Sequence, residues 1–199
     1  MLTCADEHSG AALRSWTGRA EAAPPGARAL AEHGLRLARG SAADRAAFHA
    51  GYVSVAGDPG IDAVEIVTEL RRAVLLAEAC LAAGAPLPDA ERLAEALRPF
   101  QGRLTVLARV RFHPRNGYTS VPRLDVRLGT GFSMQPALEV RAEPFVDTAA
   151  PPQEGHPVVS GAVVEATFRA ADERAMQTLV IHVDNVYLMV ATVDLARMP

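Results

Sequence analysis

The sequence predicts an α+β protein, with helices in residues 1–101 and an antiparallel sheet of about six strands in residues 102–199. Two observations predict this class. Apolar residues recur at three- and four-residue steps before residue 101, and they alternate at every second position after residue 103. The first period is that of an amphipathic helix, and the second is that of a half-buried strand. We expect the two regions to pack as one compact unit.

The longest helical pattern predicts a helix over residues 61–83. Asp58 suits its N-cap, and Gly84 suits the left-handed position after its last turn. Arg71 and Arg72 interrupt the apolar run, so this helix is too polar to span a membrane. We expect it to lie across the apolar face of the sheet. Its apolar stripe consists of Ala63, Val67, Leu70, Val74, Ala77 and Leu81.

Shorter patterns precede and follow this helix. Ser41 and Asp44 have the spacing of a capping box, which predicts the start of a helix that ends near Ala50. Residues 52–56 alternate like a brief strand. Further helices are predicted over residues 11–23, 25–39 and 89–100.

The strands of the second half carry one apolar face and one charged face. This pattern is typical of an antiparallel sheet that is covered on one side. Asn116 and Gly117 suit the turn between the first two strands. A three- or five-residue loop centred on Gly117 places Val110 opposite Leu124, and a bulge near Pro122 is the alternative. The predicted strands cover residues 103–112, 124–128, 138–143 and 158–169.

The last predicted hairpin, residues 178–195, differs because both of its faces are apolar. A two-residue turn at Asp184 and Asn185 would pair His182 with Tyr187. The second apolar face must then meet another layer of the protein or a partner molecule. On this register the predicted interface residues are Val180, Met189 and Val193.

The amino-acid composition limits the binding partners and the cellular location that can be expected. The net charge of −3 argues against a general affinity for nucleic acid or for an anionic membrane. All twenty basic residues are Arg, which fits a GC-rich bacterial genome. Cys4 and Cys80 are badly placed for a disulfide, and the chain opens with no secretory leader, so we expect a cytoplasmic protein.

The sequence contains no strong catalytic, nucleotide-binding or zinc-binding motif, so we expect no cofactor and no metal. His182 and Tyr187, with Glu165 nearby, are the candidates for acid–base catalysis, although a hydrogen-bonded core histidine is the favoured interpretation. His113 and His156, in loops, are candidates for ligand binding.

Five arginines lie on the polar face of the predicted sheet, namely Arg109, Arg111, Arg123, Arg127 and Arg141. They suggest a platform for RNA or another polyanion. Acidic residues share that face and no aromatic residue interleaves with the arginines, so an ion-pair lattice is favoured.

Two functions remain open. The favoured one is a non-catalytic protein–protein interaction or assembly module that self-associates through the last hairpin. The alternative is a small-molecule binding protein or enzyme, with a pocket between the helix over residues 61–83 and the sheet. The sequence does not decide whether the protein is an enzyme.

Overall fold

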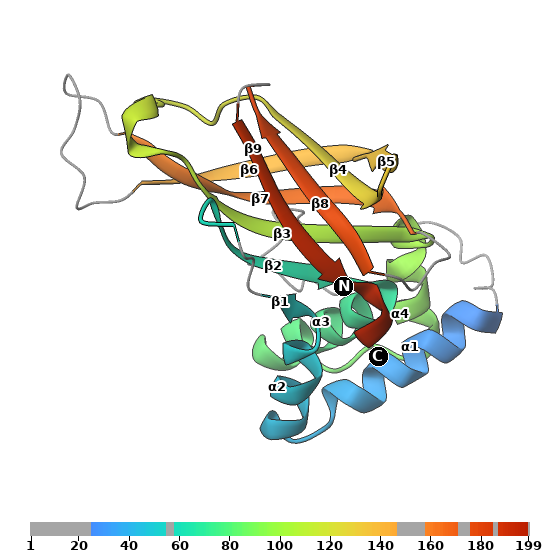
Figure 1. Cartoon of the computed structure of the whole chain (residues 1–199). Coiled ribbons are helices and arrows are strands. Elements are labelled where there is room, and N and C mark those ends of the chain that lie inside the picture. The colour runs from blue at the N-terminus through green and yellow to red at the C-terminus, as the bar shows by residue number, and fades with distance from the viewer. Residues whose placement is uncertain (1–24, 55–57, 147–157, 171–175, 185–186, 199) are drawn as a thin grey trace. The chain divides into compact units, whose positions relative to one another are not determined.

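A computed structural model describes residues 25–54, 58–146, 158–170, 176–184 and 187–198 (Figure 1). These residues form helices and two antiparallel sheets, which confirms the α+β class. The chain divides into a helical unit, residues 1–49 and 68–102, and a sheet unit, residues 50–67 and 103–199. The predicted helix over residues 11–23 lies outside the described residues, and the single compact unit stays a prediction.

The helices begin where the sequence provides caps. The Ser41 hydroxyl accepts a hydrogen bond from the Asp44 backbone N–H, and the Asp44 carboxylate accepts from the Ser41 N–H, which confirms the capping box. The Asp89 carboxylate caps the last α-helix, with its oxygen 2.8 Å from the Arg92 nitrogen. The helical elements are α1 (Pro25–Ala38), α2 (Ala42–Ala50), α3 (Glu69–Ala82), α4 (Ala90–Leu97) and the 3₁₀ turn η1 (Arg98–Phe100).

Small residues build the core of the helical unit. At Gly34 the helices α1 and α3 approach so closely that an added Cβ would lie 2.5 Å from the Cβ of Ala73. Such proximity requires a residue without a side chain. The buried core is formed by Ala31, Leu35, Ala38, Ala73, Val74, Ala77, Leu93, Ala94 and Leu97.

The predicted helix over residues 61–83 is wrong in its first third. Residues Ile61–Val67 form strand β2, and α3 begins only at Glu69. Thr68 is its N-cap, because the Thr68 hydroxyl accepts a hydrogen bond from the Arg71 N–H at 3.2 Å. A bulge between Ile61 and Ala63 breaks the alternation of β2, so its apolar spacing resembles a helical one. The left-handed Gly84, with φ 66°, is where it was predicted.

The sheet unit contains two sheets where the sequence predicted one. Besides β2, its strands are β1 (Val53–Ser54), β3 (Arg103–Arg111), β4 (Leu124–Thr130), β5 (Ser133–Pro136), β6 (Glu139–Val146), β7 (Val159–Arg169), β8 (Met176–Val183) and β9 (Tyr187–Asp194). Sheet A has the strand order β1-β2-β3-β7-β6, and sheet B has the order β5-β4-β8-β9.

The predicted hairpin between the first two strands of this region is also wrong. Val110 of β3 pairs with Ala162 of β7, and Leu124 of β4 pairs with Val183 of β8. The chain between β3 and β4 is long and includes a 3₁₀ turn, η2, at Pro114–Asn116, so these strands are free to join different sheets. Alternation determines which face of a strand is buried, but it does not select the neighbouring strand.

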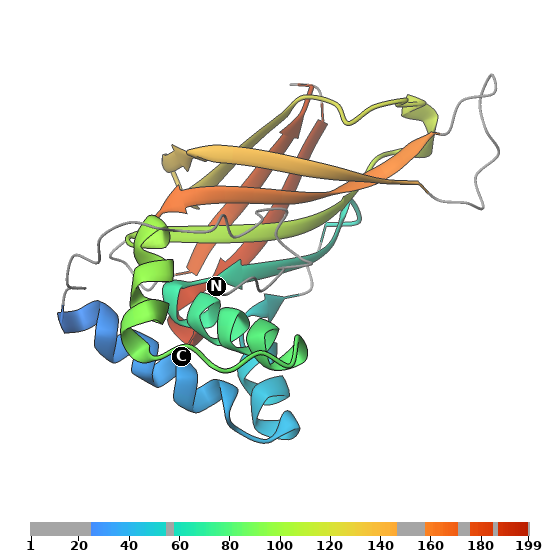
Figure 2. The same cartoon turned by 180° about the vertical axis from the view of Figure 1, so that it is seen from behind.

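The two sheets share one core. Figures 1 and 2, which view the protein from opposite sides, show the strands of sheet B crossing those of sheet A. The chain passes from one sheet to the other at Ala137 and Leu138, whose N–H groups donate to Val126 of sheet B and to Thr167 of sheet A. Fully buried residues from both sheets fill the space between them, among them Val64, Val110, Leu128, Ala162, Phe168, Leu179 and Ile181.

Candidate functional site

The structure separates the residues predicted to act together in catalysis. Glu165 lies on β7 between the buried Val164 and Ala166, so it points outward from sheet A. His182 lies on β8 between the buried Ile181 and Val183, so it points outward from sheet B. The two side chains therefore lie on opposite outer faces of the sheet unit, and they do not form an acid–base site.

The predicted pairing of His182 with Tyr187 is wrong by one residue. His182 stands opposite Leu188, and Tyr187 stands opposite Val183. Asp184 adopts a left-handed conformation with φ 50°, and three residues, not two, separate the paired positions of β8 and β9. Asp is one of the few residues other than Gly that tolerate this conformation.

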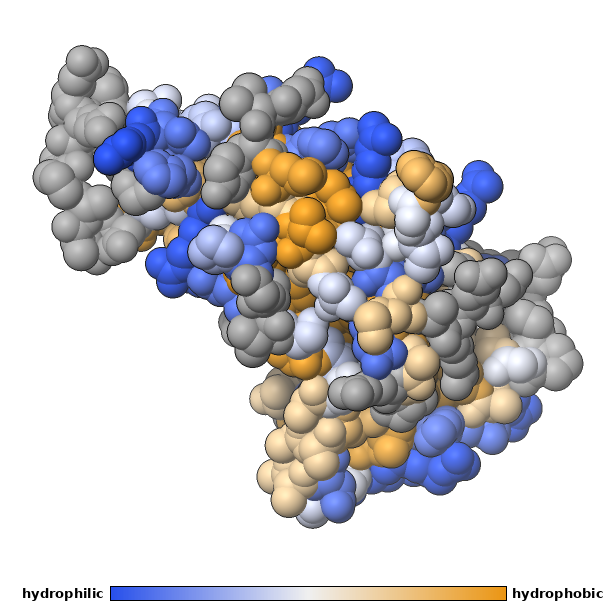
Figure 3. All heavy atoms as spheres, in the orientation of Figure 1, coloured by the Kyte–Doolittle hydropathy of each residue, from blue (hydrophilic) through white to orange (hydrophobic). Residues whose placement is uncertain are grey.

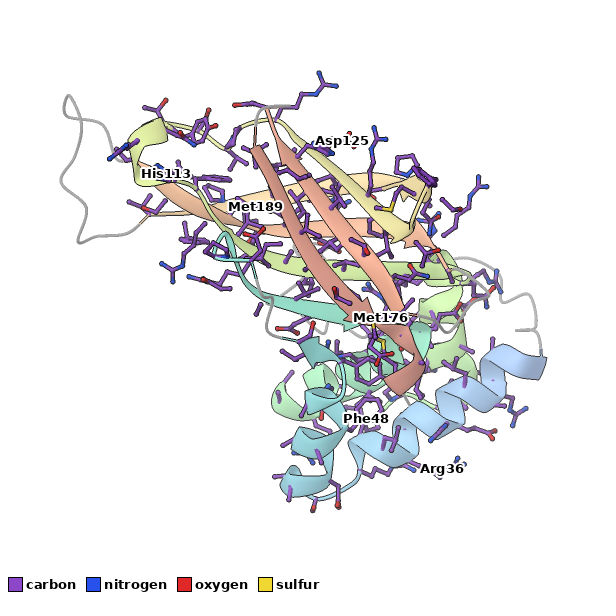
Figure 4. The ribbon with its side chains drawn as sticks, in the orientation of Figure 1. Arg36, Phe48, His113, Asp125, Met176 and Met189 are labelled. Carbon is purple, nitrogen blue, oxygen red and sulfur yellow. The ribbon has the colours of Figure 1, made fainter. Side chains whose placement is uncertain are left out.

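The shifted register also corrects the predicted interface. Met189 and Val193 are each 1% exposed and belong to the core between the sheets, so they are not surface residues of this chain. Figure 4 shows Met189 on β9. Val180, the third predicted interface residue, is half-buried on the outer face. Leu188 and Val190, which the predicted register assigned to the opposite face, share that outer face with it.

An apolar patch therefore covers the outer face of sheet B. We call it the β8–β9 patch and define it as Val180, Leu188 and Val190. Leu188 is 51% exposed and Val190 is 39% exposed, and Val190 is the cross-strand partner of Val180. Figure 3 shows apolar side chains gathered over β8 and β9 on this face. This contiguity distinguishes the patch from the scattered apolar residues of ordinary surfaces.

Polar side chains border the β8–β9 patch on the β4 side. Asp125 is paired with His182, and Arg127 is paired with Val180 (Asp125 is labelled in Figure 4). Within the chain the Arg127 guanidinium contacts the Asp125 carboxylate at 2.9 Å. Both side chains are part-exposed, at 48% for Arg127 and 35% for Asp125, so each can contact a second molecule.

The Asp58 carboxylate binds a backbone N–H on the free edge of β9, beside the β8–β9 patch. Asp58 accepts a hydrogen bond from the Val190 N–H at 3.0 Å, and its other oxygen accepts from the Gly60 N–H at 2.7 Å. The predicted role of Asp58 as a helix cap is therefore replaced by a contact with an edge strand. Occupying an edge N–H in this way opposes the addition of a further strand there.

Sheet A presents a different outer face. The Asp62 carboxylate lies 2.7 Å from Arg111 and 3.3 Å from Arg109. The Arg109 guanidinium also lies over the ring of Phe145, 4.1 Å from its centroid. Arg141 pairs with Glu139 on the same sheet, at 2.8 Å. These contacts are ion pairs, as the favoured interpretation predicted, but the five arginines do not share one face: Arg127 lies on β4 of sheet B, and Arg123 directly precedes that strand. Phe145 adds an aromatic ring that the sequence pattern did not reveal.

The candidate ligand-binding histidines have different outcomes. His113 is exposed and caps the 3₁₀ turn η2, because its Nδ1 accepts a hydrogen bond from the Arg115 N–H at 3.2 Å (Figure 4). This is a local structural role. His156 lies outside the described residues.

One polar cluster of the helical unit was missed by the sequence patterns. Glu78 of α3 contacts two residues of α2, with His49 Nε2 at 2.9 Å from one carboxylate oxygen and Arg45 at 3.0 Å from the other. The sequence indicated only a solvent-facing or capping role for His49. The cluster joins two helices that are distant in sequence, and no local spacing could have revealed it.

Tyr118 is a titratable group of the sheet unit with a perturbed environment. Burial raises the pKa of its phenol, and the hydrogen-bonded Asp184 carboxylate raises that pKa further. Asp184 in turn accepts a hydrogen bond from the Arg123 N–H at 2.9 Å. Tyr118 thus helps to hold the turn that sets the register of β8 and β9.

Two classes of site find no support in the described part of the chain. Its His, Cys, Asp and Glu side chains form no group of three or more that could hold a metal ion. Its helices include none that is both long and apolar enough to cross a membrane. Comparison of the chain with protein-family models, with curated proteins and with solved structures finds no match.

Proposed function

We propose that this protein is a non-catalytic protein–protein interaction module that self-associates through the outer face of sheet B. The observation that carries the proposal is the β8–β9 patch, in which the exposed Leu188 and Val190 of β9 lie beside the half-buried Val180 of β8. Covering them removes apolar surface from water, and each square ångström buried contributes about 25 cal/mol. Three side chains make a small contact, so the association is weak and depends on concentration.

A second copy of the chain fits this surface because its border carries both signs of charge. Asp125 and Arg127 lie side by side on β4, so the border is neutral as a whole. A border of one sign would repel an identical surface, whereas a mixed border can complement its own copy after rotation. The surface therefore has the self-complementary character that a symmetric dimer requires.

The test is sedimentation velocity over a concentration series, comparing the wild type with Val190→Glu. The wild type is expected to shift from monomer toward dimer as its concentration rises. Glu at position 190 would place an unpaired charge in the contact, so the dissociation constant should rise more than tenfold, which corresponds to more than about 1.4 kcal/mol.

A matched control is available on the other sheet. Val163 is 37% exposed on the outer face of sheet A, close to the 39% of Val190, and it lies between Arg109 and Glu143. Val163→Glu should leave the association unchanged. A wild type that stays monomeric at all concentrations, or a Val163→Glu effect as large as that of Val190→Glu, would refute the proposal.

A further inference from the structure

The positions on the outer face of sheet B form two rows that run across the strands. Asp125, His182 and Leu188 stand side by side in one row, and Arg127, Val180 and Val190 stand side by side in the next. The rows are two residues apart along each strand, or about 7 Å. Each row thus begins with a charge on β4 and ends with an apolar side chain on β9.

Two faces in contact are related by a two-fold axis that lies in the plane between them. An axis parallel to the strands would exchange β4 with β9. It would place Asp125 and Arg127 against Leu188 and Val190 of the other copy, so the ion pair that they form within one chain would be buried against apolar side chains and gain no partner from the other copy. Removing charges from water costs several kcal/mol per charge, and one ion pair need not repay that cost, so this arrangement is disfavoured.

An axis perpendicular to the strands, halfway between the rows, exchanges the two rows instead. Asp125 then faces Arg127 of the other copy, and Leu188 faces Val190 of the other copy. On β8, which lies between β4 and β9, His182 of each copy faces Val180 of the other copy. Each carboxylate on β4 meets a guanidinium, and each apolar side chain on β9 meets another. The strands of the two copies run antiparallel across the contact, which is compatible with the aligned packing of sheets.

We propose that two copies of this chain associate about such an axis, with Asp125 of each copy paired to Arg127 of the other. This inference rests on the proposed self-association and adds its geometry. The carboxylate and guanidinium that contact each other within one chain would each gain a second partner of opposite charge. The pairing fixes the register of the contact, while the β8–β9 patch supplies its apolar surface.

A double charge swap tests the geometry without removing any charge. The variant Asp125→Arg with Arg127→Asp retains an ion pair within the chain, and in the proposed dimer each guanidinium again faces a carboxylate. Its dissociation constant should therefore stay within about threefold of the wild-type value. The single variant Arg127→Asp places two carboxylates face to face twice in each dimer, so its dissociation constant should rise at least about tenfold.

Mixing the wild type with the double swap gives the decisive result. In a mixed dimer the wild-type Asp125 would face the carboxylate that Arg127→Asp introduces, and the wild-type Arg127 would face the guanidinium that Asp125→Arg introduces. Like charges would thus meet at both positions, so mixed dimers should be depleted. Because the swap leaves the mass unchanged, the variant is produced with ¹⁵N and the species are counted by native mass spectrometry. Homodimers of both proteins with few mixed dimers are the expected result.

Two other outcomes separate this inference from the proposed function. Statistical mixing, or a preference for mixed dimers, would overturn the pairing of Asp125 with Arg127 while leaving self-association intact, provided that Val190→Glu still dissociates the dimer. Absence of any wild-type dimer would overturn both. Circular dichroism spectra that match the wild type show that the variants are folded.

Discussion

The helical unit and the sheet unit bury their cores with different side chains. In the helical unit α1 and α3 meet over alanines, and at Gly34 their backbones come too close for a Cβ. In the sheet unit the space between the two sheets is filled by large side chains such as Phe168, Leu128 and Ile181, all 0% exposed. The close approach of α1 and α3 requires small side chains between them, whereas the core of the sheet unit requires large side chains that fill the space between the two sheets.

The largest expected effect is in the sheet unit. Phe168→Ala should destabilise the protein by about 3–5 kcal/mol, because it leaves a cavity between the sheets. Urea-induced unfolding measures this change. Phe132→Ala is the matched control, since Phe132 is fully exposed at the turn between β4 and β5 and should change the free energy of unfolding by less than about 0.5 kcal/mol. Equal effects of the two substitutions would contradict the assignment of Phe168 to the core.

The opposite change should be the damaging one in the helical unit. Gly34→Ala adds a methyl group where none fits, so we expect a loss of about 1–3 kcal/mol in urea-induced unfolding. Gly26→Ala, in the same helix, meets no atom within 4 Å and should leave stability unchanged or raise it by up to about 1 kcal/mol. If both substitutions were stabilising, α1 and α3 would not approach as closely as described.

A smaller effect is expected at the start of α3. Thr68→Ala removes the hydroxyl that accepts from the Arg71 N–H, at a cost of about 1 kcal/mol. Thr68→Ser retains the hydroxyl, and Ser is at least as good an N-cap as Thr, so the free energy of unfolding, again measured in urea, should stay close to that of the wild type. A full loss in the Ser variant would show that the Thr68 methyl group, and not the cap, carries the effect.

The smallest effect concerns ionisation of Tyr118. Because burial and Asp184 raise the pKa of this phenol in the folded protein, its protonated form contributes stability that is present below the pKa of an unfolded tyrosine. That stability is lost as the pH rises through the folded pKa. Absorbance titration at alkaline pH should show a phenol that ionises late, and Tyr118→Phe should remove it.

A matched substitution identifies the cause of that shift. Asp184→Asn removes the carboxylate charge, so the pKa of Tyr118 should fall toward that of free tyrosine. Burial would keep it somewhat raised. An unchanged titration in Asp184→Asn would mean that the carboxylate does not act on Tyr118.

Local patterns in the sequence were sufficient for the features that depend on neighbouring residues. The capping box at Ser41 and Asp44 and the left-handed Gly84 both follow from contacts within a few residues. The buried face of β3 followed from alternation, because side chains of a strand point alternately to its two faces. The α+β class follows from the sum of these local signals.

The candidate surface was predicted only in part. The final hairpin was identified, and Val180 was correctly assigned to its outer face, but a turn one residue longer moved Met189 and Val193 into the core and brought Leu188 and Val190 out. A shift of one residue reverses every side chain of a strand. The turn length depends on Asp184, which is held by Arg123 and Tyr118 from distant parts of the chain.

Short-range signals place most of the helices and strands and identify the apolar side of most strands, since helix caps, turns and periodicity act over a few residues. Contacts between distant segments were needed to establish that Ile61–Val67 is a strand, that β3 and β4 belong to different sheets, and that His182 and Glu165 face apart. These outcomes depend on pairing between segments that are distant in sequence. Such pairing is selected by the packing of the whole core, because many pairings satisfy the same local pattern.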